Sequence, residues 1–191
     1  NNVFIEDNLF YDNRHNVAAG TGARYVFRNN TQTTTYRARW WGMVDAHGQG
    51  DGDHGTRAFE IYGNTFDMTG IPGSNPSAVG ALFRGGDGVF FNNTINLGKS
   101  PVSDKPYGII LVVEGTDGCS SDLPAAYPGR DQTTDLYVWG NSNNNVSLGG
   151  DNWDDCADWI KEGRDFHIKP RPGYTPYTYP HPLRAQAWPT P

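Results

Sequence analysis

The chain has 191 residues, with 24 glycines, 13 prolines and only 19% charged residues. This composition favours short strands and turns over the Lys/Glu/Leu-rich helices of many cytosolic proteins. The formal net charge of -6 gives no broad positive potential, so the sequence predicts no nucleic-acid partner. The longest apolar run, residues 109–113, is much shorter than the roughly 20 residues of a transmembrane helix, so no membrane span is predicted.

Five segments share one form, a short strand followed by a turn that ends in asparagine. They are residues 3–8, 25–30, 59–64, 88–93 and 136–141. Aligned on their last residue, they give an asparagine column: Asn8, Asn30, Asn64, Asn93 and Asn141. Asparagine tolerates left-handed turn geometry, and stacked side-chain amides can hydrogen-bond along a ladder. The column therefore predicts one turn shape that recurs in every repeat.

Alternate positions before these asparagines are mostly apolar and should face a core, because alternate residues of a strand point to one side. The core columns are Ile5, Phe27, Ile61, Phe90, Val138 and Val3, Tyr25, Phe59, Gly88, Leu136. The column between them, Phe4, Val26, Glu60, Val89 and Tyr137, is mixed and should face outward. Irregular spacing between repeats favours a solenoid with long loop insertions; an antiparallel sandwich is the rival interpretation.

A second, weaker set of strands precedes the repeats, at residues 15–20, 43–48, 81–86 and 110–115, and each ends in glycine. Together with the N-N-T turns at residues 29–31 and 92–94 and the G-N-T-F turn at 63–66, this pattern resembles the pectate-lyase-like right-handed parallel β-helix proteins of bacteria and their phages. The resemblance covers about residues 1–148. It implies an all-β, right-handed parallel β-helix, secreted to the extracellular space, with polysaccharide as partner. That superfamily includes lyases, hydrolases, tailspikes and adhesins, so the resemblance does not fix an activity.

Two regions are predicted, parallel coils over residues 1–148 and a C-terminal cap with an extended strap over residues 149–191. The strap is rich in proline and tyrosine, and its prolines remove the backbone donors that a sheet interior requires. Because residue 1 already lies in a repeat, we expect that N-terminal coils are missing from the chain. The alternative is self-association through the uncapped N-terminal coil.

The most polar cluster follows the second strand of the weaker set. On a strand Asp45 and His47 point the same way, and the next residues add His54 and Arg57. β-Elimination from a uronic acid polymer needs a base and a cation that stabilises the enolate. We therefore predict a catalytic site of Asp45, His47, His54, Arg57 and Arg84, in which a histidine is the base and an arginine, with Arg24 as a further candidate, is the cation.

Other interpretations of this region remain open. Hydrolysis would use two carboxyl groups, and Asp45, Asp51, Asp53 and Glu60 are candidates. Asp51 and Asp53 are also a candidate Ca²⁺ site, although no cofactor is required by the predicted chemistry, and the loop can equally be a solvated glycine-rich insertion. Arg14 and His15 are predicted either to face the same groove as His47 or to form a structural salt link.

Aromatic and basic residues are interleaved in the stretch between the predicted strands at residues 25–30 and 43–48. They are predicted to bind substrate by stacking on sugar rings and pairing with acidic groups, or else to fill an insertion; they are Tyr36, Arg37, Arg39, Trp40 and Trp41. The two cysteines, Cys119 and Cys156, are predicted to form a disulfide, as in secreted frameworks, with two unpaired thiols as the alternative.

The chain lacks the W-x-D-H and R-x-P-x-x-R signatures of pectate lyases and the ordered catalytic elements of polygalacturonases. No catalytic residue can therefore be transferred by motif. The sequence predicts an extracellular carbohydrate-active β-helix protein, with lyase chemistry on an acidic polysaccharide favoured over hydrolysis. The alternative is a structural fibre, adhesin or carbohydrate-binding β-helix that is not catalytic.

Overall fold

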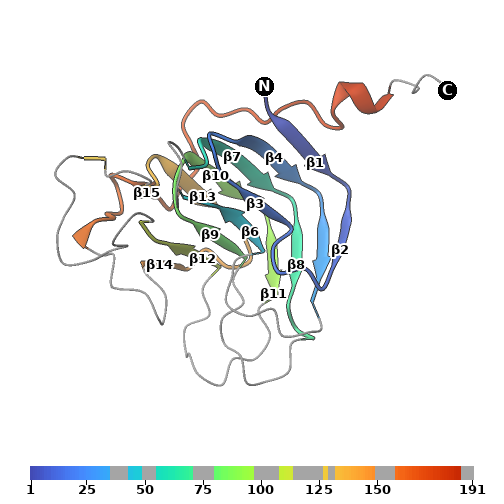
Figure 1. Ribbon diagram of the computed structural model, residues 1–191, viewed down its shortest axis with the longest axis horizontal. Helices are drawn as coiled ribbons and strands as arrows, with labels where there is room; N and C mark the ends of the chain where they lie inside the picture. The colour runs from blue at the N-terminus through green and yellow to red at the C-terminus, as the bar shows by residue number, and fades with distance from the viewer. Residues whose placement is uncertain are drawn as a thin grey trace.

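The structure is a computed structural model that describes residues 1–34, 43–48, 55–70, 80–96, 108–113, 127–128, 132–148 and 158–185. These residues form three sheets in which every strand pairing is parallel (Figure 1). Strands that are distant in sequence are neighbours in each sheet. Because all these pairings are parallel, an antiparallel sandwich is excluded for the described residues. The arrangement is consistent with the predicted parallel β-helix.

The chain visits the sheets in a fixed order. The first, which we call sheet A, contains β1 (Val3–Glu6), β4 (Arg24–Arg28), β7 (Ala58–Tyr62), β10 (Asp87–Phe91), β13 (Leu136–Trp139) and β15 (Phe166–His167). Sheet B contains β2 (Leu9–Tyr11), β5 (Thr31–Thr33), β8 (Thr65–Asp67) and β11 (Thr94–Asn96). Sheet C contains β3 (Val17–Ala19), β6 (Val44–Ala46), β9 (Ala81–Phe83), β12 (Ile109–Leu111) and β14 (Val146–Leu148). A 3₁₀ turn, Pro182–Ala185, follows near the C-terminus.

The strand register confirms the columns predicted from the sequence. Phe4, Val26, Glu60, Val89 and Tyr137 are Cα partners from coil to coil, as are the two core columns beside them. Core side chains of the three sheets meet between them: Phe59 of sheet A stacks on Phe83 of sheet C at 4.4 Å, and Phe27 of sheet A stacks on Phe66 of sheet B at 6.4 Å between ring centroids. One apolar core therefore joins the three sheets.

The turn that follows β1, β4, β7, β10 and β13 of sheet A begins in the same way each time. Its first residue has positive φ, at Asp7, Asn29, Gly63, Asn92 and Gly140 (52–67°), a conformation that glycine, asparagine and aspartate adopt at the lowest cost. Its second residue is the column asparagine. At Gly63 a Cβ would lie 2.5 Å from Oδ1 of Asn29 on the preceding coil, so a side chain there would collide with its neighbour.

The predicted asparagine ladder is present. In each coil the backbone N–H and the Nδ2 of the asparagine both donate to Oδ1 of the asparagine in the next coil, at 2.9–3.1 Å, from Asn8 through to Asn141. Each Nδ2 also donates to a backbone carbonyl. Asn144, which the column did not include, closes the ladder by accepting from both nitrogens of Asn141.

The last coil departs from the pattern. After Asn141 the described chain passes directly to β14 in sheet C, with no strand of sheet B between them. The predicted cap region contributes β15, which pairs with β13 and extends sheet A by one strand.

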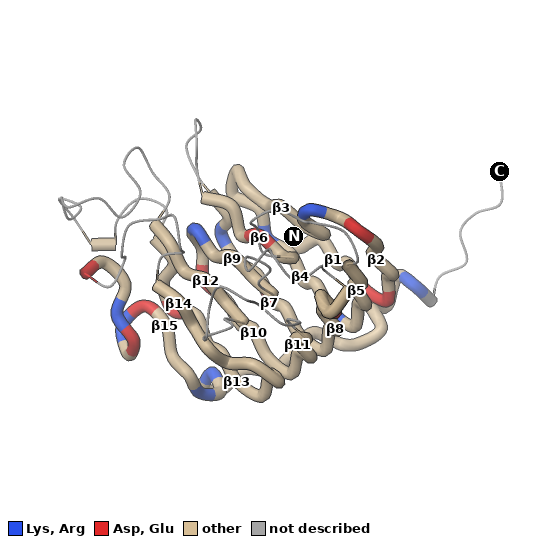
Figure 2. Tube along the Cα trace, turned by 90° about the horizontal axis from the view of Figure 1, so that it is seen from below, with Lys and Arg blue, Asp and Glu red and all other residues tan. Residues whose placement is uncertain are grey.

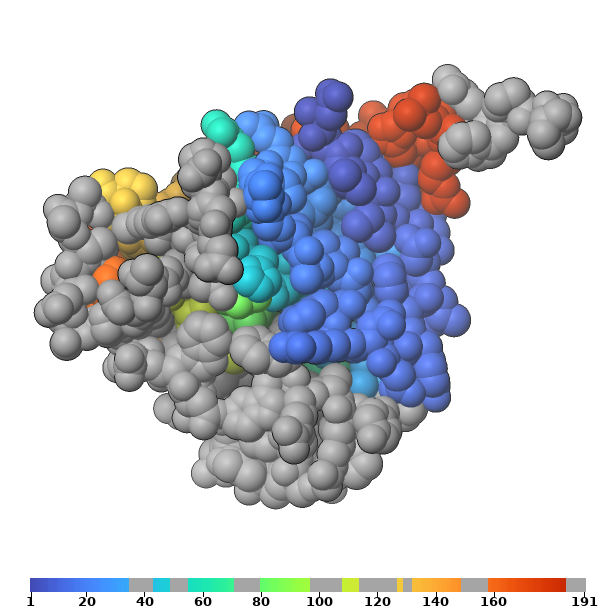
Figure 3. All heavy atoms as spheres, viewed as in Figure 1, coloured from blue at the N-terminus to red at the C-terminus, as the bar shows by residue number. Residues whose placement is uncertain are grey.

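The strap runs along the outer face of sheet A, beside the first coil (Figures 1 and 3). Under it lies a second apolar cluster of Val26, Tyr62, Val89 and Phe91, with Tyr174 of the strap packed against it. Tyr62, Phe91 and Trp139 stack one on another at 4.6 and 4.4 Å. The outward column is therefore buried where the strap covers it, which explains why it contains two valines that are fully buried.

Arg28 holds the strap to the sheet. Its side chain is fully buried, and its guanidinium donates to Oε2 of Glu6 (2.9 Å), to the hydroxyl of Tyr62 (2.7 Å) and to the carbonyls of Tyr177 (2.7 Å) and Thr178 (2.8 Å). Charge-assisted bonds of this kind are stronger than neutral ones. Among the described residues no helix is long and apolar enough to span a membrane.

Candidate active site at the end of sheet C

The predicted site falls only partly within the described residues. His54, Asp51, Asp53, the aromatic-basic set (Tyr36, Arg37, Arg39, Trp40, Trp41) and the predicted disulfide of Cys119 and Cys156 lie outside them. Asp45, His47, Arg57 and Arg84 are described, and so is His15. These five come from three successive coils and lie at or beside strands of sheet C or the start of sheet A.

Asp45 and Arg84 form a buried ion pair. Asp45 is in β6 and Arg84 directly follows β9 in the next coil; their side chains are 0% and 6% exposed. Nε of Arg84 donates to Oδ1 of Asp45 at 3.1 Å, and Nη2 donates to Oδ2, which makes the contact bidentate. A planar guanidinium fits a carboxylate in this geometry. The two charges neutralise each other inside the protein, and removing one partner of such a pair costs about 3–5 kcal/mol.

His15 extends this pair into the preceding coil. Its Nε2 lies 3.9 Å from Oδ2 of Asp45, and its side chain is 16% exposed. Three coils thus contribute one polar side chain each to a single cluster. Beneath it, the hydroxyl of Tyr25 is buried, and its pKa is raised well above the ordinary value, mainly by burial and secondarily by the negative charge of Asp45.

His47 immediately follows β6, and its ring orientation is fixed by the backbone. Its Nδ1 lies 2.9 Å from the carbonyl oxygen of Gly48. Because a carbonyl can only accept, Nδ1 must carry the proton, and the neutral ring then has its lone pair on Nε2. This tautomer suits a general base that acts through Nε2.

The backbone directly before Arg57 is hydrogen-bonded to His47. The N–H of Thr56 donates to the carbonyl of His47 at 2.8 Å, the hydroxyl of Thr56 donates to the carbonyl of Ala19, and the N–H of Arg57 donates to the carbonyl of Ala23 at 2.9 Å. The Arg57 side chain is exposed. A half-buried imidazole and an exposed guanidinium therefore flank the same connection between sheets C and A.

The groups available here are a base directly after β6 and a cation directly before β7. His47 can accept a proton, Arg57 can stabilise a developing negative charge, and the Asp45–Arg84 pair fixes the neighbouring strand ends. Within the described ranges no group of three or more His, Cys, Asp or Glu side chains could hold a metal ion, and the predicted Ca²⁺ ligands lie outside those ranges. In Figure 2 the charged positions lie mainly at turns and connections, while the strands are largely uncharged.

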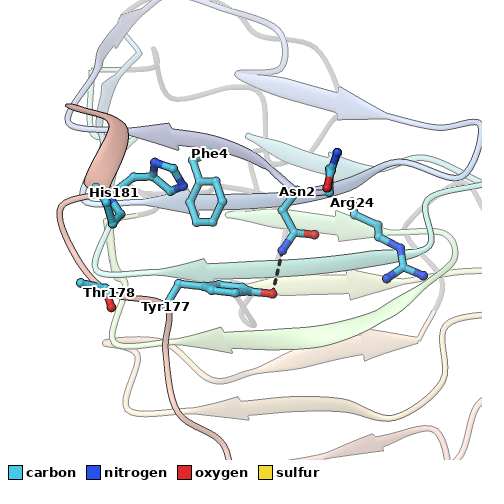
Figure 4. A pocket seen from close by; sticks show the side chains of 8 residues that line it. Asn2, Phe4, Arg24, Tyr177, Thr178 and His181 are labelled. Carbon is cyan, nitrogen blue, oxygen red and sulfur yellow. Dashed lines mark hydrogen bonds between the residues drawn. The ribbon is translucent and has the colours of Figure 1, made fainter. Parts of the chain in front are cut away.

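A pocket away from these residues was not predicted. A pocket of about 470 Å³ lies between β1 and the strap. Its lining side chains include Asn2, Phe4, Arg24, Tyr177 and His181 (Figure 4). No local motif could have indicated it, because Asn2 and Tyr177 are 175 residues apart in sequence and meet only when the strap crosses the first coil.

Comparison with known proteins identifies no relative: no family model matches the chain, and neither the curated proteins nor the solved structures include a significant match. The resemblance to pectate-lyase-like β-helices thus rests on the repeat and on the parallel sheets. A functional assignment has to come from the side chains described above.

Proposed function

We propose that the chain is an extracellular right-handed parallel β-helix that binds an acidic polysaccharide and cleaves it by β-elimination. The observation that carries the proposal is His47, whose Nδ1 faces the carbonyl of Gly48, so that Nε2 is the basic nitrogen. The parallel sheets support it because stacked coils offer an extended surface along which a linear polymer can lie.

In the proposed reaction Nε2 of His47 removes the proton on the uronate carbon next to the carboxylate. The electron pair released from that C–H bond passes first into an enolate, which the positive charge of Arg57 stabilises. It then forms a carbon–carbon double bond as the neighbouring bond to the glycosidic oxygen breaks. The leaving oxygen takes a proton from water or from the protonated histidine. Asp45 and Arg84 neutralise each other and serve as positioning residues.

The proposal is tested by incubating the full chain with a panel of uronic-acid polymers and following the ultraviolet absorbance of the unsaturated product. The wild type should form this product, and His47→Ala should reduce the rate by at least about a hundredfold, the lower end of what a general base contributes. Arg57→Gln should reduce it as well. His167→Gln is the control, because His167 lies in β15, in the last strand of sheet A. Absence of product with every polymer, or rates that His47→Ala leaves unchanged, would contradict the proposal.

A second candidate function is non-catalytic self-assembly as a fibre or adhesin. It is favoured by the first coil, whose strands β1, β2 and β3 each lie at the end of a sheet and whose Val3, Leu9 and Tyr11 are 62%, 75% and 61% exposed. Unpaired strand edges with apolar side chains can pair with another chain. Light scattering would reveal oligomers that Leu9→Asp disperses; a monomer at all concentrations would contradict this candidate.

A further inference from the structure

The pocket between β1 and the strap has a fixed framework. Its lining includes Phe4 of β1 and Tyr177 and Thr178 of the strap. Both strap carbonyls at this point accept hydrogen bonds from the buried Arg28 guanidinium. The Phe4 ring meets the Tyr177 ring edge to face, with centroids 5.3 Å apart. The pocket is therefore held open by contacts already made in the folded chain, which lowers the entropic cost of binding.

Its polar groups are mainly donors. Nδ2 of Asn2 donates to the Tyr177 hydroxyl oxygen at 2.8 Å, which leaves the phenolic proton directed elsewhere. Nδ1 of His181 accepts from the N–H of Leu183 at 3.2 Å, so the neutral ring carries its proton on Nε2. Arg24 adds an exposed guanidinium, and the side-chain oxygen of Asn2 adds one acceptor. Figure 4 shows Phe4 projecting between His181 and Asn2, with the Tyr177 hydroxyl pointing to Asn2.

Two carboxylates near the pocket are neutralised by arginines. Glu6 is paired with Arg28, and Asp7 is paired with Arg184. Hydrogen-bond donors, among them the Arg24 guanidinium, together with aromatic rings match a small ligand that combines a carboxylate, hydroxyl groups and a ring with an apolar face. The volume of about 470 Å³ lies within the range of roughly 300–1,000 Å³ typical of small-molecule sites.

We infer that this pocket binds a single hexuronate unit, with its carboxylate paired to Arg24 and its ring against Phe4 and Tyr177. This goes beyond the proposed cleavage, because it assigns a binding site between β1 and the strap, formed only when the strap is in place. The site would hold an acidic sugar without any bond being broken.

The test is isothermal titration calorimetry of the full chain with free glucuronate and galacturonate, with glucose as the neutral comparison. These monomers have no glycosidic bond, so cleavage cannot interfere. We expect the uronates to bind and glucose to bind at least tenfold more weakly. Arg24→Gln should weaken uronate binding by at least tenfold, which corresponds to about 1.4 kcal/mol, and Tyr177→Phe should weaken it less. Lys169→Gln is the matched control, since it removes the same charge from an exposed strap residue outside the pocket lining.

The outcomes separate this inference from the proposed function. Uronate binding that depends on Arg24 supports the pocket even if the wild type cleaves no polymer. The inference is overturned if neither uronate binds, if glucose binds equally well, or if Arg24→Gln binds as the wild type does while its thermal unfolding is unchanged. In each of those cases, cleavage of polymers that depends on His47 would leave the proposed function standing.

Discussion

Replacing Asn64 with alanine should test whether the asparagine ladder stabilises the fold. Asn64 lies in the middle of the ladder and is 1% exposed. Its Nδ2 donates to Oδ1 of Asn93 (2.9 Å) and to the carbonyl of Phe27 (3.0 Å). Its Oδ1 accepts from the backbone N–H (2.9 Å) and from Nδ2 (3.1 Å) of Asn30. The substitution removes all four bonds, and water has little access to replace them.

The size of the effect follows from these contacts. Buried hydrogen bonds contribute about 0.5–1.5 kcal/mol each, so four of them give about 2–6 kcal/mol. That is a large part of the free energy of unfolding of a folded protein, which is roughly 5–15 kcal/mol. Asn8 provides the matched control. Its side chain is at the exposed end of the same ladder and donates only to Oδ1 of Asn30 and to the carbonyl of Glu6, so Asn8→Ala should cost less than about 1 kcal/mol because water can replace these bonds.

Urea unfolding followed by tryptophan fluorescence would measure both variants. We expect a clear loss of unfolding free energy for Asn64→Ala and little change for Asn8→Ala. Equal effects of the two substitutions would refute the reasoning, because the ladder would then contribute no more in its buried middle than at its exposed end.

Two further predictions concern the strap. Arg28→Met should lower the unfolding free energy by about 3–5 kcal/mol, because it leaves the buried carboxylate of Glu6 without its cation. Limited proteolysis should then cut the strap sooner, and an unchanged cleavage rate would argue against Arg28 as the residue that holds the strap to the sheet. The hydrogen bond from Tyr179, with help from Arg184, lowers the pKa of Asp7 from its ordinary value of 3.8. A lowered folded-state pKa stabilises the fold above the ordinary value and loses that contribution as pH falls through the folded-state value. Unfolding free energy should therefore decrease with acidification below about pH 3.8, and Asp7→Asn should flatten that part of the profile.

The coils of sheet A could be predicted because their signal is local. Alternation of apolar side chains and an asparagine at the following turn recur in each repeat, and the predicted columns match the observed strand partners from Val3 to Leu136. The strap's contact surface could not be predicted in the same way. Arg28 stands at an outward position in the sequence, like a solvated residue, and its burial depends on Tyr177 and Thr178, about 150 residues later.

For the candidate site, the sequence could predict only which residues that are near one another in the chain belong together. His47 and Arg57 flank one short stretch of sequence, and the N–H of Thr56 donates to the carbonyl of His47. The pairing of Asp45 with Arg84 depends on the register between β6 and β9. The length of the sequence insertion between these two strands does not determine that register. The tautomer of His47 could not be predicted either, because the carbonyl oxygen of Gly48 lies against Nδ1. Every residue has a backbone carbonyl, so the sequence cannot indicate which one accepts a hydrogen bond from a side chain.

The positions of the insertions explain how one chain can combine a regular scaffold with an irregular site. Consecutive ladder asparagines are 22, 34, 29 and 48 residues apart, yet in the first four coils the turn from sheet A to sheet B has two residues each time. The variation in length is confined to the connections that enter and leave sheet C. His47 and Arg57 stand at the two ends of one such connection, while the ladder lies at the opposite corner of the coil. Loop changes at the site can therefore alter chemistry without breaking the hydrogen bonds that keep the coils in register.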